Sequence, residues 1–134
     1  IIDTVYFRTD SDEILRRSFA LLDNVAAVIN AHTELPRIRV EGHTDARGTR
    51  EHNLDLSQRR AASVMRYLVE EGHVEAGRLE AVGYGMDRPV VPEAHTRAEH
   101  AQNRRVVFHI VREGVDDGGI ATTSSGPSAD TIDR

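Results

Sequence analysis

Two side chains of opposite charge, Asp45 and Arg60, are the residues of this sequence best suited to binding chemistry. They lie within the stretch GHTDARGTREHNLDLSQRRA, from Gly42 to Ala61, where a strand-like run is followed by a helix-like one. One interpretation is an internal salt bridge that ties the loop to the helix, because most ion pairs in proteins are structural. The other is a receptor for a zwitterion, in which the carboxylate binds an ammonium and the guanidinium binds a carboxylate.

Other kinds of chemistry find little support in the sequence. His43 and His52 flank Asp45, but their spacing matches no familiar metal-binding motif, and the pattern assigns no role to His95 and His100. No serine has the G-x-S-x-G setting of a hydrolase nucleophile, and the chain has no cysteine. We therefore expect no catalytic residue, no metal and no cofactor.

Hydrophobic periodicity predicts the elements that must position these residues. Period-two alternation is typical of strands, and apolar residues every three or four positions are typical of helices. Strands are expected at 2–7, 37–45, 78–85 and 104–111, and helices at 9–32, 52–72 and 96–102. Asp10 and Glu13 are arranged as a capping pair for the first helix, and Gly72 is placed at the C-terminal cap of the second.

The predicted sheet should be covered on one face only. Apolar Ile38 and Val40 alternate with Arg39 and Glu41, so one face of their strand meets water. The alternation of strands and helices favours parallel pairing through right-handed crossovers. Together these patterns predict a two-layer domain rather than a three-layer doubly wound fold.

Length and composition limit the chain to one ordinary domain. The 134 residues, of which 39% are hydrophobic, suffice for one core. Residues 1–112 form the expected domain. Residues 113–134 are rich in Gly, Ser, Thr and Asp, and we expect a flexible tail or linker there.

Charge and hydropathy exclude several classes of partner. The formal net charge of -5 argues against a sequence-independent grip on nucleic acid or anionic lipid, since both need clustered Lys and Arg. No apolar run approaches the roughly 20 residues that span a bilayer, so we expect no direct membrane insertion by this domain. Because the first residue is Ile1 rather than Met, we expect an upstream part that could carry an anchor.

The central stretch resembles one known family. The pattern T-D, then N, then L-S-x-x-R-A, with GYG and AQNRRVVF downstream, is similar to the OmpA-like C-terminal domain family over about Val5 to Val111. This family includes peptidoglycan-associated lipoproteins and flagellar-motor stator proteins. The resemblance implies an α+β two-layer sandwich with a mixed four-stranded sheet and helices on one face, in the order strand, helix, strand, helix, strand, a short helix and strand.

The resemblance also implies a ligand and the residues that bind it. In the family the domain binds the peptide stem of peptidoglycan without covalent chemistry, and the Asp of T-D and the Arg of L-S-x-x-R-A hold its diaminopimelate residue. Those positions are Asp45 and Arg60 here, with Thr44 preceding the Asp. We expect Asn53 and Leu56 to fix the loop and the helix start, whether or not they also touch the ligand.

Two further segments complete the expected site and its surroundings. After the first strand many relatives have an aromatic and acidic pair, whereas this chain has Arg8 and Thr9 before Asp10, so contacts from Thr9 and Asp10 are expected through the backbone. Asn103 and Arg104 are expected to anchor the start of the last strand through structural hydrogen bonds or an ion pair.

The function that follows from the resemblance is binding rather than catalysis. We expect a non-enzymatic module that binds diaminopimelate-containing peptidoglycan in the periplasm or cell envelope and is attached to the outer membrane through an upstream segment. Wall attachment of a flagellar-type stator remains the alternative binding function, and a peptidoglycan-modifying enzyme is the alternative from another class. A homodimer also stays open.

Overall fold

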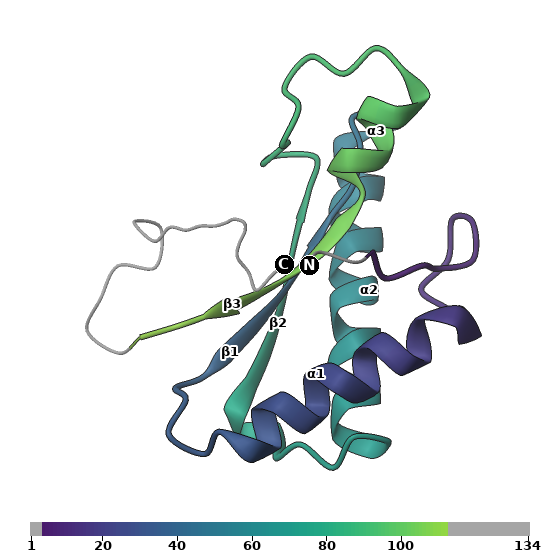
Figure 1. The fold of residues 1–134 in the computed structure, drawn as a ribbon. Coiled ribbons are helices and arrows are strands. Elements are labelled where there is room, and N and C mark those ends of the chain that lie inside the picture. Colours follow the sequence, from purple (N-terminus) through teal and green to yellow (C-terminus); the bar gives the residue numbers. More distant parts are fainter. Residues whose placement is uncertain (1–3, 113–134) are drawn as a thin grey trace.

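The computed structural model describes residues 4–112 and has one sheet with helices beside it (Figure 1). The helices are α1 (Phe19–Ala31), α2 (Arg50–Glu70) and α3 (Arg97–Asn103), and the strands are β1 (Ile38–His43), β2 (Leu79–Gly85) and β3 (Arg105–Ile110). Short 3-10 turns at Arg16–Ser18 and Ala76–Arg78 precede α1 and β2. None of the helices described combines the length and the apolar character that a bilayer crossing requires.

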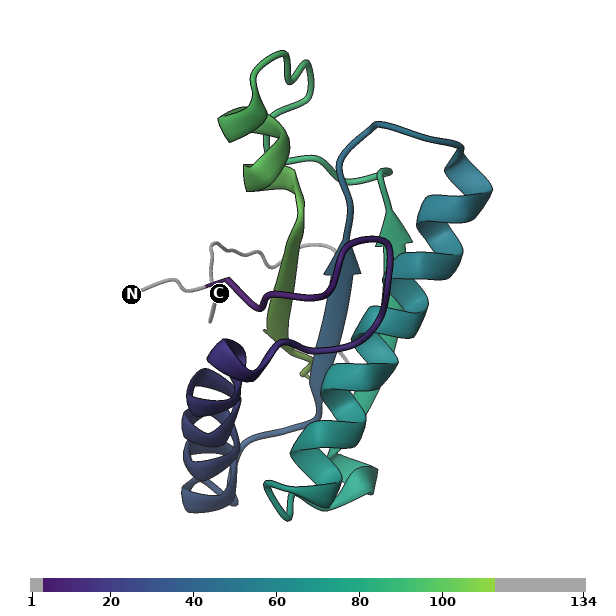
Figure 2. The same ribbon diagram turned by 90° about the vertical axis from the view of Figure 1, so that its right-hand side faces the viewer.

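The sheet is mixed and has the order β2-β1-β3. The central strand β1 pairs with β2 in parallel and with β3 in antiparallel orientation. Helices α1 and α2 both lie against the same face of the sheet, whereas α3 lies beyond one end of it (Figure 2). The predicted α+β class, the two layers and the mixed sheet are therefore confirmed.

The sheet within the described residues has three strands rather than the four expected. Of residues 4–7, the described part of the strand predicted at 2–7, only Phe7 forms a bridge, an isolated one to Ile14. The backbone of Tyr6 instead bonds the turn before α1, since its N–H donates to Ser18 Oγ at 2.7 Å and its carbonyl accepts from Leu15 N at 2.9 Å. Val5 is still buried in the hydrophobic core, although its segment is not a paired strand.

The parallel pairing that the alternation of elements favours is found between β1 and β2, whereas the last strand is antiparallel, as a mixed sheet allows. The chain leaves β2 at Gly85, and residues 86–103, including α3, stay at that end of the sheet (Figure 1). Because β3 then starts from the end where β2 finished, it runs antiparallel to β1. No crossover covers the sheet between them, and a parallel arrangement would have required one.

Helix α1 begins later than the sequence pattern predicts. Asp10 has a φ of 54°, and α1 begins only at Phe19 with Ser18 at its N-cap, so Asp10 and Glu13 are not its capping pair. Residues 8–13 form a loop instead, closed by the Arg8 N–H donating to the Glu13 carbonyl at 2.9 Å. The first full helical turn starts only at Phe19.

Helix α2 begins two residues before the predicted start. The Thr49 hydroxyl accepts from the His52 N–H at 3.1 Å and caps the helix. At the other end the left-handed residue is His73, with a φ of 60°, rather than Gly72. Gly72 is needed for close packing, because a Cβ there would collide with Ala26 Cβ and lie 2.8 Å from the Leu68 carbonyl oxygen.

Two glycines let the backbone of α2 lie directly on the sheet. A Cβ at Gly42 of β1 would collide with the Ser57 carbonyl, and a Cβ at Gly83 of β2 would collide with the Gln58 backbone nitrogen. Below this contact the core is closed by side chains with almost no exposure, among them Val40, Val64 and Leu68. The close approach fixes the first turns of α2 at the end of β1, where the predicted binding residues lie.

Candidate functional site

A pocket of about 420 Å³ lies between the N-terminal segment and the ends of β1 and β3. Residues that line it include Thr9, Asp10, His43, Arg47, Arg60 and Arg104. The segment 4–10 forms one wall, and the start of β3 with the residue before it forms the opposite wall. Arginines predominate among the charged side chains that face this space.

Asp45 follows β1 directly and is a buried carboxylate held by two arginines. Its Oδ2 accepts from Arg47 Nη2 at 2.8 Å and from Arg104 Nη1 at 2.7 Å, while Oδ1 accepts from the Arg47 backbone N–H at 3.0 Å. Burial alone would raise the pKa of Asp45, but the hydrogen bonds from Arg47 and Arg104 outweigh it and hold that pKa well below its usual range. The carboxylate is therefore ionised at neutral pH.

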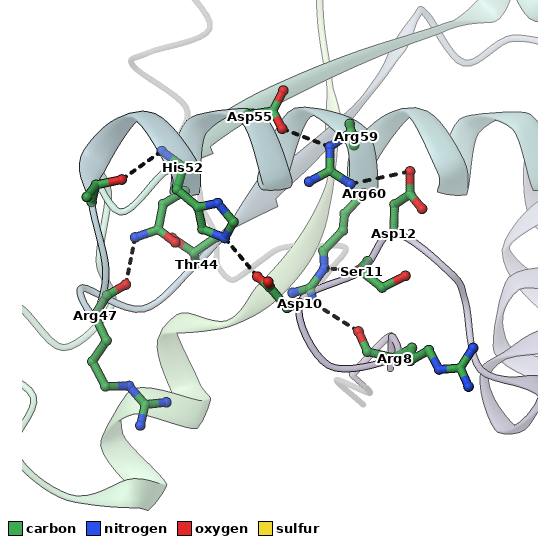
Figure 3. Close-up of polar contacts among 12 residues, drawn as sticks. Arg8, Asp10, Ser11, Asp12, Thr44, Arg47, His52, Asp55, Arg59 and Arg60 are labelled. Carbon is green, nitrogen blue, oxygen red and sulfur yellow. Dashed lines mark hydrogen bonds and ion pairs between the residues drawn. The ribbon is translucent and has the colours of Figure 1, made fainter.

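Arg60 is a half-buried guanidinium that bonds to main-chain oxygens. Its Nε donates to the Ser11 carbonyl at 2.7 Å and its Nη2 to the Arg8 carbonyl at 3.4 Å (Figure 3). The guanidinium carbon also lies 4.8 Å from the centre of the Phe7 ring. Burial lowers the pKa of Arg60 from its ordinary value, which leaves the group a cation at neutral pH.

The internal salt bridge considered from the sequence does not form between Asp45 and Arg60 in the described part of the chain. Asp45 binds Arg47 and Arg104, and Arg60 binds the loop at 8–11. Arg60 lines the pocket, whereas Asp45 is buried behind it and is linked to it through Arg47 and Arg104, which do line it. The predicted pair is therefore connected to one pocket, and Asp45 and Arg60 do not neutralise each other.

Three of the predicted residues are buried supports behind the pocket. The amide of Asn53 donates to the Arg47 carbonyl at 2.8 Å and to the Asp45 carbonyl at 3.4 Å, which fixes the loop after β1. Thr44 donates through its hydroxyl to the Asp45 carbonyl at 3.0 Å and through its backbone to the Gly85 carbonyl at 2.8 Å. Leu56 is 6% exposed. The hydrogen bonds of Asn53 agree with a supporting role, and whether it also contacts a ligand stays a prediction.

Thr9 and Asp10 are exposed and line the pocket from the N-terminal loop. Asp10 Oδ1 lies 2.7 Å from His52 Nε2, which links this loop to the first turn of α2 (Figure 3). The loop is therefore held to α2 by His52, by Arg60 and, through Asp12 at 3.7 Å, by Arg59. These contacts place the backbone of residues 8–11 beside the guanidinium of Arg60.

His43 and His52, which flank Asp45 in the sequence, are in different environments: His43 is buried and the His52 side chain is exposed. His43 is 4% exposed, its ring stacks on Tyr84 at 5.4 Å between ring centres, and its Nε2 lies 3.4 Å from Glu41 Oε1. Burial lowers the pKa of His43 to about 4 despite the contact with Glu41, so the ring is neutral at pH 7. The described residues hold no cluster of three or more His, Cys, Asp or Glu side chains that could bind a metal ion.

Sequence reasoning missed Arg47 and found only part of the role of Arg104. The signal for Arg47 was available, since an arginine two residues after an aspartate in a turn can fold back onto it. The anchoring role of the residues before β3 is confirmed: Asn103 Oδ1 accepts from the Val90 and Val91 N–H groups at 2.8 Å, and Arg104 forms an ion pair. The sequence did not indicate that the partner of Arg104 is Asp45.

Comparisons with known proteins give one consistent result. The sequence profile of the OmpA family matches residues 6–104. A peptidoglycan-associated lipoprotein of Pseudomonas aeruginosa is 45% identical over 105 residues, which are 78% of this chain and 60% of that protein, so the chain spans less than two thirds of this relative.

Two solved structures are similar to the chain. The crystal structure of the peptidoglycan-associated lipoprotein from Burkholderia pseudomallei has a TM-score of 0.69 and 37% identity, covering 81% of this chain and 91% of that one. The C-terminal domain of Helicobacter pylori MotB has a TM-score of 0.70 and covers 85% of this chain and 88% of that one. At 24% identity, this second similarity shows the fold alone.

Proposed function

The chain belongs to the OmpA family, and from this membership we propose that it is a non-catalytic module that binds the peptide stem of peptidoglycan. The names of the relatives in Pseudomonas aeruginosa and Burkholderia pseudomallei, both peptidoglycan-associated lipoproteins, support binding to the wall. The bound residue in this proposal is diaminopimelate. The role of the module is to anchor an envelope protein to the cell wall.

The observation that carries this proposal is that Arg60 lines the pocket while the Asp45 carboxylate, behind it, is paired with two other arginines of the pocket lining rather than with Arg60. Arg60 presents a guanidinium that donates to the neutral carbonyls of Ser11 and Arg8 within the described part of the chain, so a ligand carboxylate would give it an anionic hydrogen-bond partner. Asp45 supplies an ionised carboxylate for an ammonium. The free stereocentre of diaminopimelate bears an ammonium and a carboxylate on one carbon, which matches this arrangement.

The expected affinity is modest. Each charge-assisted hydrogen bond contributes about 1.5 to 3 kcal/mol, so two or three of them over a small ligand correspond to micromolar to millimolar dissociation constants. Such weak binding suffices for anchoring because the wall repeats the stem peptide densely and a tethered protein rebinds quickly. The chain in this proposal works in the periplasm, as part of a longer protein attached to the outer membrane.

Co-sedimentation with purified diaminopimelate-containing sacculi tests the proposal. The parent chain should pellet with sacculi, and Arg60→Ala should remain in the supernatant. Arg59→Ala should behave as the parent, because Arg59 does not line the pocket and its ion pairs, with Asp55 on the same helix and with Asp12 of the loop, are both partly exposed. Binding should survive EDTA. A parent that stays in the supernatant, or that releases soluble muropeptides from the sacculi, contradicts the proposed function.

A further inference from the structure

One oxygen of Asp45 serves two guanidiniums. Arg47 Nη2 and Arg104 Nη1 both donate to Oδ2, at 2.8 and 2.7 Å, and both arginines line the pocket. Among the described residues Asp45 is the carboxylate that forms an ion pair with either of them. Two positive charges at the pocket wall are thus balanced by one negative charge.

Binding of an ammonium at Asp45 upsets this balance. The inference therefore rests on the proposed function, in which the ligand brings such an ammonium. The ligand ammonium, Arg47 and Arg104 would then compete for the Asp45 carboxylate, and Arg47 is the side chain that can leave Oδ2 most easily. The Arg47 side chain is 61% exposed against 38% for Arg104, and it belongs to the loop rather than to the junction between α3 and β3.

Neighbouring carboxylates do not compensate a displaced Arg47. Asp10 lines the same pocket but its Oδ1 is already 2.7 Å from His52 Nε2. Arg60 adds a further positive charge, which the carboxylate of the bound diaminopimelate would balance. A ligand whose only charges are one ammonium and one carboxylate therefore leaves the guanidinium of Arg47 without a counter-charge.

We infer that Arg47 moves from Asp45 to a second carboxylate of the bound peptide, so that the site selects peptides by the charge next to diaminopimelate. Arg47 is then both the internal occupant of the ammonium position and a specificity-determining residue. A diaminopimelate stem offers two sources of this carboxylate, the α-carboxylate of the preceding D-glutamyl residue and the C-terminal carboxylate. Amidation of one of them should weaken binding.

The experiment uses four synthetic tetrapeptides and three forms of the protein. The peptides are N-acetyl-L-Ala-γ-D-Glu-meso-diaminopimelyl-D-Ala, its glutamyl α-amide, its C-terminal amide and the double amide, so that diaminopimelate carries the one ammonium of each. The proteins are the parent, Arg47→Gln and the matched control Arg50→Gln. Arg50 is a suitable control because it is 60% exposed, pairs with Asp87 and does not line the pocket. Isothermal titration calorimetry gives the dissociation constants.

The parent and Arg50→Gln should bind one of the two single amides about tenfold more weakly than the free acid, which corresponds to the loss of about one charge-assisted hydrogen bond. Arg47→Gln should bind the free acid and both single amides within about twofold of one another. It should bind the double amide at least as tightly as the parent does, because no side chain competes with the ligand ammonium at Asp45.

Four results would overturn the inference. Equal, tight binding of all four peptides by the parent leaves the proposed function intact and shows that no second carboxylate is recognised. If Arg47→Gln still binds a single amide more weakly than the free acid, a residue other than Arg47 recognises the second carboxylate. Weaker binding of the double amide by Arg47→Gln than by the parent means that Arg47 contacts diaminopimelate itself. Failure of the parent to bind any peptide overturns the proposed function together with this inference.

Discussion

The Nε of Arg60 lies 2.7 Å from the main-chain carbonyl oxygen of Ser11, across 49 residues of sequence. This bond makes the arginine a structural residue as well as a pocket residue, because it fastens the N-terminal loop to α2. A ligand carboxylate that reaches Arg60 therefore meets a guanidinium whose orientation is already fixed. Side-chain order before binding lowers the entropic cost of association.

Removal of Arg60 should lower the stability of the protein as well as weaken ligand binding. Arg60→Ala loses hydrogen bonds to two carbonyls, and we expect it to cost about 1 kcal/mol of stability, or a fall in Tm of about 4 to 8 °C. Arg59→Ala should change Tm by less than about 2 °C, because its ion pairs with Asp55 and, at 3.7 Å, with Asp12 of the loop are both partly exposed and contribute little. Thermal unfolding followed by circular dichroism measures both, and equal Tm values for the two variants would contradict the fastening role.

Gly83 should be far less tolerant of alanine than Gly77. A Cβ at position 83 collides with the backbone of α2, and we expect Gly83→Ala to cost about 1 to 3 kcal/mol. Gly77 has nothing within 4 Å of such a Cβ and lacks a positive φ, so Gly77→Ala should be neutral or more stable by about 0.4 to 1 kcal/mol. Urea unfolding of both variants gives the comparison. A tolerated alanine at 83 would mean that α2 does not pack as closely as described.

His43 should make the protein less stable in mild acid. Burial lowers its pKa from 6.5 to about 4, so between these values the unfolded chain binds a proton at this position that the folded chain does not. Stability from this group is therefore fully present above about pH 6.5 and falls by about 1.4 kcal/mol per unit as the pH drops toward 4.

The variant His43→Phe isolates this effect, since it keeps a ring against Tyr84 but cannot titrate. The free energy of unfolding of the parent should fall more steeply with decreasing pH than that of the variant. The absolute stability of the variant is not the readout, because the contact with Glu41 is also lost. Parallel curves between about pH 7 and pH 4 would show that His43 carries no such shift.

The tail predicted at 113–134 lies outside the described residues, and its dispensability stays a prediction. A chain that ends at Glu113 should keep the Tm and the sacculus binding of the full chain, because the tail's composition cannot build a core. A loss of several degrees on truncation would show that the tail packs on the domain.

Much of the fold could be predicted because its determinants are local. The amphipathic pattern of α2, the alternation in β1 and the glycines that close β2 specify these elements from short stretches of sequence. The start of α1 could not be predicted in this way. Asp10 and Glu13 have the spacing of a capping pair, but contacts from His52 and Arg60 of α2 hold residues 8–11 in a loop.

The candidate site was predictable where it depends on a motif and not where it depends on pairing across the chain. Asp45 and Arg60 follow from the pattern around α2, and the support by Asn53 follows from its place in the first turn. The bond between Asp45 and Arg104 joins residues 59 positions apart, and no local pattern encodes it. The direction of β3 decides that contact, because its first residues lie beside the end of β1 only when the strands run antiparallel.

The central claim is that Asp45 and Arg60 recognise an ammonium and a carboxylate on one carbon, and the ligand can test it without a variant protein. A stem peptide with lysine in place of diaminopimelate keeps the ammonium but lacks the adjacent carboxylate that Arg60 would bind. Calorimetric titration of the parent with the two peptides should give a dissociation constant at least about tenfold larger for the lysine peptide. Equal dissociation constants for the two peptides would contradict the claim and move the ligand contact away from Arg60.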